Sequence, residues 1–184
     1  MKTLVIHPDD RSTDFLKPIY QYIPTIKVLT GGVSKKEIES LIQEHDRIIM
    51  LGHGTPNGLL NINKFSATNG MYIIDKTMVE ILRGKELISI WCYAYSFIKE
   101  QKLNGFCTDM FISEELEALS FLPKEQTEKT IEESNYYFSN MVGNGFKENK
   151  LLKEIYQFTK KNYLTFSKAN EVADYNVKRL YYLK

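Results

Sequence analysis

The fold of this chain depends on two apolar runs, Arg47-Ile48-Ile49-Met50-Leu51-Gly52-His53-Gly54 and Leu87-Ile88-Ser89-Ile90-Trp91-Cys92. Each run has the length and composition of a strand buried on both faces, as in a parallel sheet. The first run leads to His53, which a glycine follows, and the second ends at Cys92. Neighbouring parallel strands end at the same edge of a sheet, about 4.8 Å apart. We therefore predict that His53 and Cys92 face each other across that edge.

Strand and helix signals alternate through the first two thirds of the chain. Short apolar runs predict further strands over residues 3–6, 26–29 and 106–112. Helices are predicted over 12–23, 35–44 and 93–103, and from Asp75 to near Gly84. Ser12 or Thr13 can cap the first helix, and Ser34 begins a capping box for the second. Such alternation implies right-handed crossovers, so we predict an α/β fold with a mainly parallel sheet and helices on both faces.

The last third of the chain has a different pattern. No strand is predicted after Pro123, and three helices are expected over 125–141, 147–161 and 167–183, with Gly143 to Gly145 separating the first two. Many aromatic residues occur at helical spacing, which is typical of core positions. We expect an α/β domain over 1–122 and a helical extension over 123–184 that packs on the same domain.

The composition limits the classes of partner and compartment. The 184 residues carry a net charge of +1, so no nucleic acid or anionic membrane is expected as a partner. No apolar stretch has the length of a membrane span, and Met1 leads directly into a strand, so no signal peptide is expected. Cys92 and Cys107 lie in different predicted strands, which argues against a disulfide and for the reducing cytoplasm.

The predicted pair of His53 and Cys92 has a coherent chemistry. A thiol becomes a strong nucleophile as its thiolate, and a neighbouring imidazole favours that form. Gly54 has no side chain to keep its backbone N–H from a developing oxyanion. The alternative is structural, with His53 at a turn of the sheet and Cys92 as a buried, inert thiol. No metal or other cofactor is required by the catalytic interpretation.

The His-Gly pair after one apolar strand and the cysteine after the next resemble the caspase-like cysteine peptidases, a group that includes clostripain, gingipain, separase and CHAT-domain branches. The resemblance covers about residues 2–121. It implies that His53 is the general base, that Cys92 is the nucleophile, and that the backbone N–H groups of Gly54 and Cys92 form the oxyanion hole. The spacing of 39 residues is shorter than the roughly 50 of caspases. The caspase string around the nucleophile is absent, since Ile90-Trp91-Cys92-Tyr93-Ala94 stands there.

The caspase-like interpretation assigns a role to aspartates at the same sheet edge. Asp9, Asp10 and Asp109 end or follow the first and last predicted strands. The resemblance places substrate pockets at this edge, where acidic residues would select lysine or arginine before the cleaved bond. The expected partner is then a peptide or protein substrate. Aspartate is also an ordinary turn residue, which is the structural alternative for all three.

Two other functions remain open from the sequence. The string His7-Pro8-Asp9-Asp10 resembles the zinc-dependent N-deacetylases, and His7, Asp10 and His53 could supply the three ligands that a zinc site needs. Arg11 stands where those enzymes usually have glutamate, and no His-x-x-His pair is present. The other alternative is a catalytically silent caspase-like scaffold that binds a partner, because the chain is small for that group of peptidases.

Overall fold

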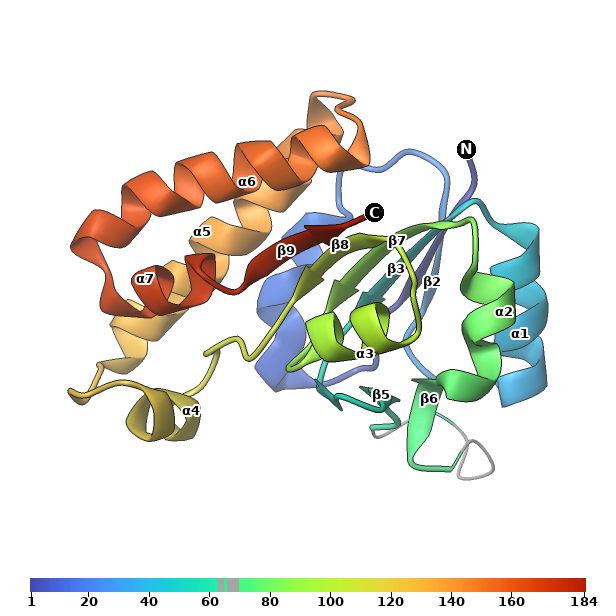
Figure 1. Ribbon diagram of the computed structural model, residues 1–184, viewed down its shortest axis with the longest axis horizontal. Coiled ribbons are helices and arrows are strands. Elements are labelled where there is room, and N and C mark those ends of the chain that lie inside the picture. The colour runs from blue at the N-terminus through green and yellow to red at the C-terminus, as the bar shows by residue number, and fades with distance from the viewer. Residues whose placement is uncertain (63–64, 66–69) are drawn as a thin grey trace.

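A six-stranded sheet in the order β2-β1-β3-β7-β8-β9 runs through the centre of the computed structural model (Figure 1). The structure describes residues 1–62, 65 and 70–184. The strands of this sheet are β1 (Thr3–Ile6), β2 (Ile26–Leu29), β3 (Arg47–Leu51), β7 (Glu86–Ile90), β8 (Gly105–Thr108) and β9 (Leu180–Leu183). Every neighbouring pair is parallel except β8 and β9. The predicted α/β fold with a mainly parallel sheet is therefore confirmed.

Helices cover both faces of the sheet (Figure 1). One face is covered by α1 (Lys35–Glu44), α2 (Val79–Leu82) and α3 (Ala94–Glu100). The other is covered by the 3₁₀ helix η1 (Arg11–Ile19), α5 (Glu128–Lys147), α6 (Leu152–Phe166) and α7 (Glu171–Val177). The short helix α4 (Glu115–Phe121) lies at the end of the molecule, beyond the carboxyl edge of the sheet. Two short 3₁₀ helices, η3 (Lys76–Met78) and η4 (Ser167–Ala169), complete the described helices.

The apolar runs form central strands because their residues are buried alternately on the two faces. Ile48 and Met50 of β3 pack in the core under α1 and α2, whereas Ile49 and Leu51 pack in the core under α5 and α6. All four side chains are fully buried. A strand with both faces covered has no polar side, which explains the continuous apolar pattern.

The C-terminal segment corrects the prediction of helix up to residue 183. Residues 180–183 form β9, which pairs antiparallel with β8 in the register Gly105↔Leu183. Leu180 and Tyr182 pack on one face of the sheet, and Tyr181 and Leu183 pack on the other. Four apolar or aromatic residues in a row suit a strand that is covered on both faces. The edge of β8 that is not paired with β7 supplies the hydrogen-bond partners of β9. The third tail helix therefore ends earlier, with α7 at Val177.

The Gly143 to Gly145 segment is a second correction, because it lies inside α5 instead of separating two helices. A Cβ on Gly143 would lie 2.3 Å from the carbonyl oxygen of Pro18, and one on Gly145 would lie 3.0 Å from Ile155. Gly143 is thus required for the close approach of α5 to η1, and Gly145 leaves room for Ile155 of α6. Close packing, not a turn, explains their presence.

Smaller corrections concern local boundaries. The helix predicted over 12–23 is η1, and its side-chain cap is Asp10, not Ser12 or Thr13. The strand predicted over 106–112 ends at Thr108 as β8. The loop expected after His53 contains β4 (Gly54–Thr55) and β5 (Gly58–Leu60), which form a small antiparallel sheet with β6 (Tyr72–Asp75). These strands are too short for a clear periodic pattern in the sequence.

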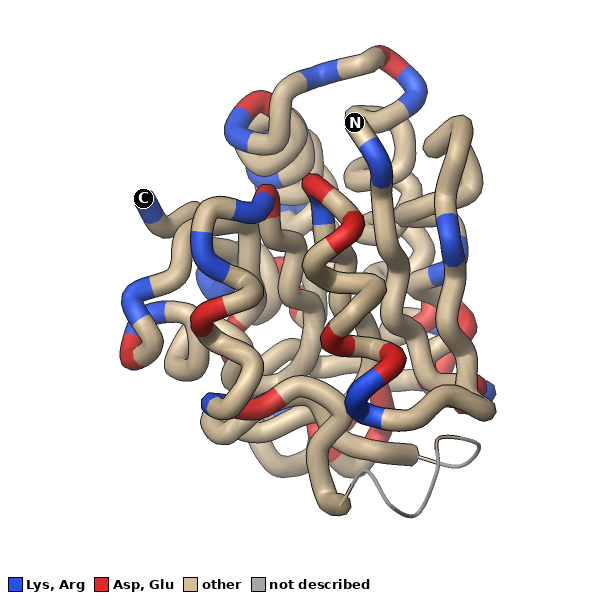
Figure 2. The backbone as a smooth tube through the Cα atoms, turned by 90° about the vertical axis from the view of Figure 1, so that its right-hand side faces the viewer, with Lys and Arg blue, Asp and Glu red and all other residues tan. Residues whose placement is uncertain are grey.

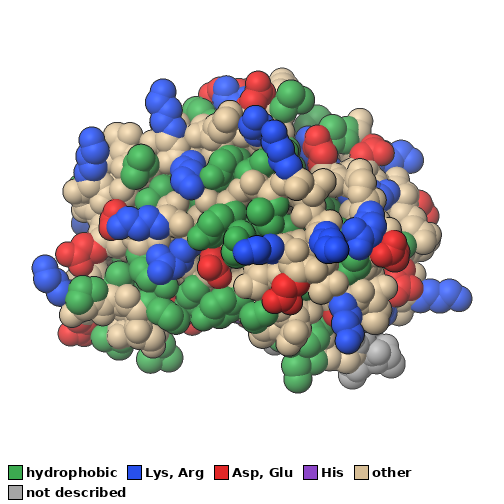
Figure 3. All heavy atoms as spheres, in the orientation of Figure 1, with side chains coloured by type: hydrophobic (Ala, Val, Ile, Leu, Met, Phe, Trp, Pro, Cys, Tyr) green, Lys and Arg blue, Asp and Glu red, His purple; other side chains and the backbone are tan. Residues whose placement is uncertain are grey.

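Charges of both signs are distributed over the views in Figures 2 and 3. Acidic and basic residues both occur along the side that carries α1 and α2 (Figure 2). Lysine and arginine side chains are spread among acidic ones on the face seen in Figure 3. Within the described residues, none of the helices has the length and apolar character needed to cross a membrane.

The packing of β9 predicts a large effect of Leu180→Ala. Leu180 is 0% exposed, so its truncation should lower the free energy of unfolding by about 2–4 kcal/mol. The measurement is urea denaturation followed by circular dichroism. The control is Leu164→Ala, since Leu164 is 54% exposed and its truncation should cost less than about 0.5 kcal/mol. Equal effects of the two variants would show that β9 is not part of the sheet.

Candidate functional site

His53 and Cys92 follow adjacent central strands at the carboxyl edge of the sheet. β3 and β7 pair in parallel from Arg47↔Glu86 to Leu51↔Ile90, so partner residues are 39 apart in sequence. The same interval separates His53 from Cys92. A hydrogen bond of 3.1 Å from the Gly52 N–H to the Ile90 carbonyl oxygen extends the pairing one residue beyond the end of β3. The structure thus brings the two residues to the same edge of the sheet, and a direct pairing of their side chains stays a prediction.

The chain turns sharply at Cys92. Tyr93, the next residue, has φ of 68° in the left-handed region and precedes the first residue of α3. A side chain in this conformation costs about 1–2 kcal/mol, and such strain is concentrated at functional sites. A small cavity of about 20 Å³ is lined by residues that include both His53 and Cys92. Its volume is enough for about one water molecule.

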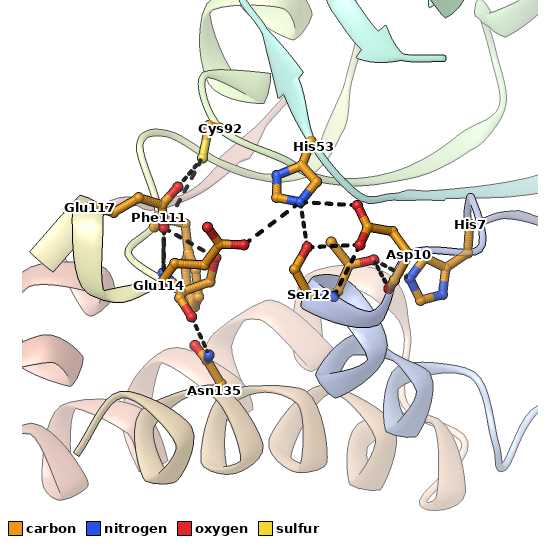
Figure 4. A network of polar contacts seen from close by, with 11 residues as sticks. His7, Asp10, Ser12, His53, Cys92, Phe111, Glu114, Glu117 and Asn135 are labelled. Carbon is orange, nitrogen blue, oxygen red and sulfur yellow. Dashed lines mark hydrogen bonds and ion pairs between the residues drawn. The ribbon is translucent and has the colours of Figure 1, made fainter. Parts of the chain in front are cut away.

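The Cys92 thiol has partners on the far side from His53 (Figure 4). The sulfur lies 3.6 Å from two acceptors, the Phe111 carbonyl oxygen and Oε1 of Glu117, and its single proton can be donated to either. Burial raises the pKa of the Cys92 thiol to about 12, and the negative charge of Glu117 adds to this shift. In this conformation the thiol is therefore protonated at neutral pH.

Glu117 connects the thiol to the start of α4. Its Oε2 accepts hydrogen bonds from the backbone N–H groups of Ser113 at 2.7 Å and Glu114 at 3.1 Å. Its Oε1 is a hydrogen-bond acceptor for the Cys92 thiol. One carboxylate therefore stabilises the first turn of α4 and holds the sulfur at the same time. Among the residues of α4, only Ala118 is buried, so this helix is attached to the core by few apolar contacts.

His53 contacts the opposite side of the site through Nε2. This nitrogen lies 2.7 Å from Oγ of Ser12, 3.5 Å from Oδ2 of Asp10 and 4.0 Å from Oε1 of Glu114. In the described part of the chain, no hydrogen bond to Nδ1 is formed. Ser12 and Asp10 lie on one side of the ring and Cys92 on the other (Figure 4). The His53 ring therefore lies between Cys92 on one side and Ser12 with Asp10 on the other. Its Nδ1 can accept a hydrogen bond from a new partner.

Gly54 begins β4, immediately after His53. A Cβ at this position would lie 2.0 Å from the Trp91 ring, so the indole requires glycine here. The indole N–H of Trp91 also donates to the Thr55 carbonyl oxygen at 3.2 Å. This packing is a structural reason for the His-Gly pair. The role of the Gly54 and Cys92 N–H groups as an oxyanion hole stays a prediction.

The three aspartates predicted to bind substrate occupy different places. Asp10 caps η1 and contacts His53. Asp9 is exposed after β1, and its N–H donates to the Thr30 carbonyl oxygen. Asp109 follows β8, where its N–H donates to the Arg179 carbonyl oxygen. Of the three, only Asp10 has a contact with the His53 side chain, and their role in substrate binding stays a prediction.

His7 is engaged in the core and not directed at a metal site. Its Nδ1 is 3.1 Å from the Tyr20 hydroxyl and its Nε2 is 3.1 Å from the Thr13 hydroxyl. Burial lowers the pKa of His7 to about 4, so the ring is neutral. Both nitrogens are thus occupied by hydroxyl partners. Over residues 1–62, 65 and 70–184, no three or more His, Cys, Asp or Glu side chains are grouped to hold a metal ion.

A larger cavity of about 520 Å³ adjoins the small one, and the two share Phe15 and Ser113 in their walls. Five carboxylate residues line it: Asp14, Glu114, Glu115, Glu128 and Glu132. Arg11 is the one basic residue among its described lining residues. We call this space the acidic cavity. Its negative walls favour a cationic ligand.

Sequence reasoning missed Ser12, Glu114 and Glu117 and the carboxylates of the acidic cavity. Glu128 and Glu132 are four residues apart on a predicted helix, which places them on one face. The sequence therefore indicates that these two carboxylates share one face of a helix. It does not show that this face lies beside the carboxyl edge of the sheet.

Comparisons with known proteins identify no relatives for this chain. No family model, no curated protein and no solved structure matches it.

The thiol environment predicts slow alkylation of Cys92 in the resting protein. Iodoacetamide reacts with the thiolate, and burial together with Glu117 disfavours that form. Glu117→Gln should lower the Cys92 pKa and increase the alkylation rate at neutral pH by about tenfold, since one pKa unit is a tenfold change in thiolate. Mass spectrometry of the Cys92 peptide measures the rate. Glu115→Gln on the same helix is the control and should leave the rate unchanged; equal rates for all three proteins would contradict the assigned role of Glu117.

Proposed function

We propose that this protein is a cysteine peptidase in which Cys92 is the nucleophile and His53 is the general base and then the general acid. The observation that carries the proposal is the common register, which brings His53 and Cys92 to the same edge beside one cavity. The resemblance to caspase-like peptidases supports it, because in that fold the two residues also end adjacent central strands. A caspase-like fold is part of the proposal.

The proposed reaction begins when the sulfur leaves Glu117 and turns toward His53. The thiol proton passes to Nδ1, and the thiolate attacks the carbonyl carbon of the peptide bond. The N–H groups of Gly54 and Cys92 would stabilise the oxyanion. His53 then protonates the leaving amine, which leaves an acyl group on Cys92, and water activated by His53 releases the acid product.

The acidic cavity supports a peptide substrate with a basic side chain next to the cleaved bond. The cavity shares walls with the space between His53 and Cys92, and its five carboxylates would attract a lysine or arginine side chain. These carboxylates would share the role expected of Asp9, Asp10 and Asp109. The free thiols of Cys92 and Cys107 fit a reducing cytoplasm as the place of action.

A binding scaffold without catalysis is the second candidate, and one observation favours it. The Cys92 thiol is hydrogen-bonded to Glu117, and its raised pKa keeps it protonated in this conformation. On this alternative, the acidic cavity holds a basic segment of a partner that is never cleaved. Activity of the wild-type protein toward basic peptides distinguishes the two candidates.

Cys92→Ala should abolish cleavage of a peptide with one lysine, because no acyl intermediate can form. Its free energy of unfolding should change by no more than about 1–2 kcal/mol, since one small side chain is truncated. His53→Gln should lower kcat strongly as well. Chelators should leave the activity of the wild-type protein intact. Cleavage that survives in Cys92→Ala, or that a chelator removes, would exclude this mechanism.

Glu132→Gln should raise KM for a lysine peptide by about two- to fivefold, because an exposed carboxylate–cation pair contributes up to about 1 kcal/mol. The kcat for the same peptide should change little. Glu133→Gln is the matched control, since Glu133 is the next residue on α5 but lies outside the walls of the cavity. Steady-state kinetics of both variants provide the comparison. An equal KM for the two would remove the acidic cavity from the substrate site.

A further inference from the structure

We propose that Ser12 and Asp10 form a positioning relay that holds the proton of His53 on Nε2 and leaves the lone pair of Nδ1 for Cys92. The inference rests on the proposed function, because it gives His53 the tautomer that a base for Cys92 requires. Both residues precede or begin η1, at the end of β1, and reach His53 across the boundary between β1 and β3. Figure 4 shows this group of side chains.

The direction of the relay follows from counting protons. Asp10 as a carboxylate only accepts hydrogen bonds. Its Oδ1 accepts from the N–H and from the hydroxyl of Ser12, each at 3.1 Å. The hydroxyl has one proton, and we assign it to Asp10 because a carboxylate accepts a stronger hydrogen bond than a neutral imidazole; Oγ then accepts at its 2.7 Å contact with Nε2. Nε2 must therefore carry the ring proton, and Nδ1 is the basic nitrogen.

The same contacts argue against Ser12 as the nucleophile. Attack by Ser12 would require its proton to leave Asp10 and pass to an unprotonated Nε2. The alkoxide would then form 3.1 Å from the Asp10 carboxylate, and two like charges at this distance repel each other. Ser12 is thus a positioning residue, and the thiol on the other side of the ring remains the nucleophile.

The carboxylates near Nε2 also suit the charged state of the ring. When the S–H bond of Cys92 breaks and an N–H bond forms at Nδ1, His53 becomes an imidazolium. Its Nε2 lies 3.5 Å from Oδ2 of Asp10 and 4.0 Å from Oε1 of Glu114. At these distances the protonated ring can form ion pairs with both carboxylates.

The other two histidines provide internal references for the tautomer. Nδ1 of His45 lies 2.6 Å from the Leu41 carbonyl oxygen, which can only accept, so His45 carries its proton on Nδ1. For His7, the Thr13 hydroxyl donates to the Asp10 carbonyl oxygen and therefore accepts from Nε2. One spectrum should then contain both tautomers, with His53 matching His7 and differing from His45.

The experiment is ¹⁵N NMR of the whole protein with labelled histidine at alkaline pH, with His53→Gln used to assign the resonances. The wild-type protein should show His53 protonated on Nε2, with a ring proton that exchanges slowly with water. In Ser12→Ala this proton should exchange at least tenfold faster, and Ser12→Thr should restore slow exchange because it keeps the hydroxyl. The control Ser34→Ala removes a serine hydroxyl far from His53, the cap of α1, and should match the wild type.

A wild-type spectrum with the His53 proton on Nδ1 would overturn the relay and favour Ser12 as the nucleophile. Unchanged proton exchange in Ser12→Ala would also overturn it. Neither result depends on peptidase activity, so the relay and the proposed function fail separately. If peptide cleavage is present, Ser12→Ala should lower kcat by about tenfold with KM unchanged, and Ser12→Thr should restore it. A loss confined to KM would show that Ser12 contacts substrate instead of positioning His53.

Discussion

The parallel pairing of β3 with β7 is the constraint on which the rest of the structure depends. Its register, with partners 39 residues apart, places His53 and Cys92 at corresponding positions beyond the two strands. A shift of one residue would turn every side chain of β7 to the opposite face of the sheet. Ile88 and Ile90 would then leave the core that lies under α5 and α6. The buried faces of the strands therefore fix the register, and the register fixes the relation between the two residues. The core thus determines the geometry of the candidate site.

The central strands could be predicted from the sequence because burial on both faces leaves a largely apolar run, as in 48–51 and 87–90. The β9 strand was missed because four apolar residues at a chain end also fit a helix, and only the unpaired edge of β8 decides between them. Gly143 and Gly145 suggested a turn, but they mark the close contacts of α5 with η1 and α6. Both errors concern tertiary contacts between segments that are distant in sequence.

The site could be predicted only in part for the same reason. The strand-end positions of His53 and Cys92 follow from local pattern, and the structure brings their strands together. The partners of these residues come from other segments: Ser12 and Asp10 from the start of η1, and Glu117 from α4. Asp10 lies within ion-pair distance of His53, whereas burial and Glu117 keep the Cys92 thiol neutral. On the proposed mechanism, the thiol must leave Glu117 of α4 before it can react.

The central claim is that Cys92, with His53, forms an acyl intermediate with a basic substrate. Mass spectrometry after acid quenching of the protein with an ester of an acyl-lysine tests it most directly. The account predicts one acyl adduct, on the peptide that contains Cys92, and little adduct when His53 is replaced by glutamine. An adduct on Ser12 would contradict the assignment of the nucleophile, and a protein that binds the ester in its acidic cavity without any adduct would be a scaffold.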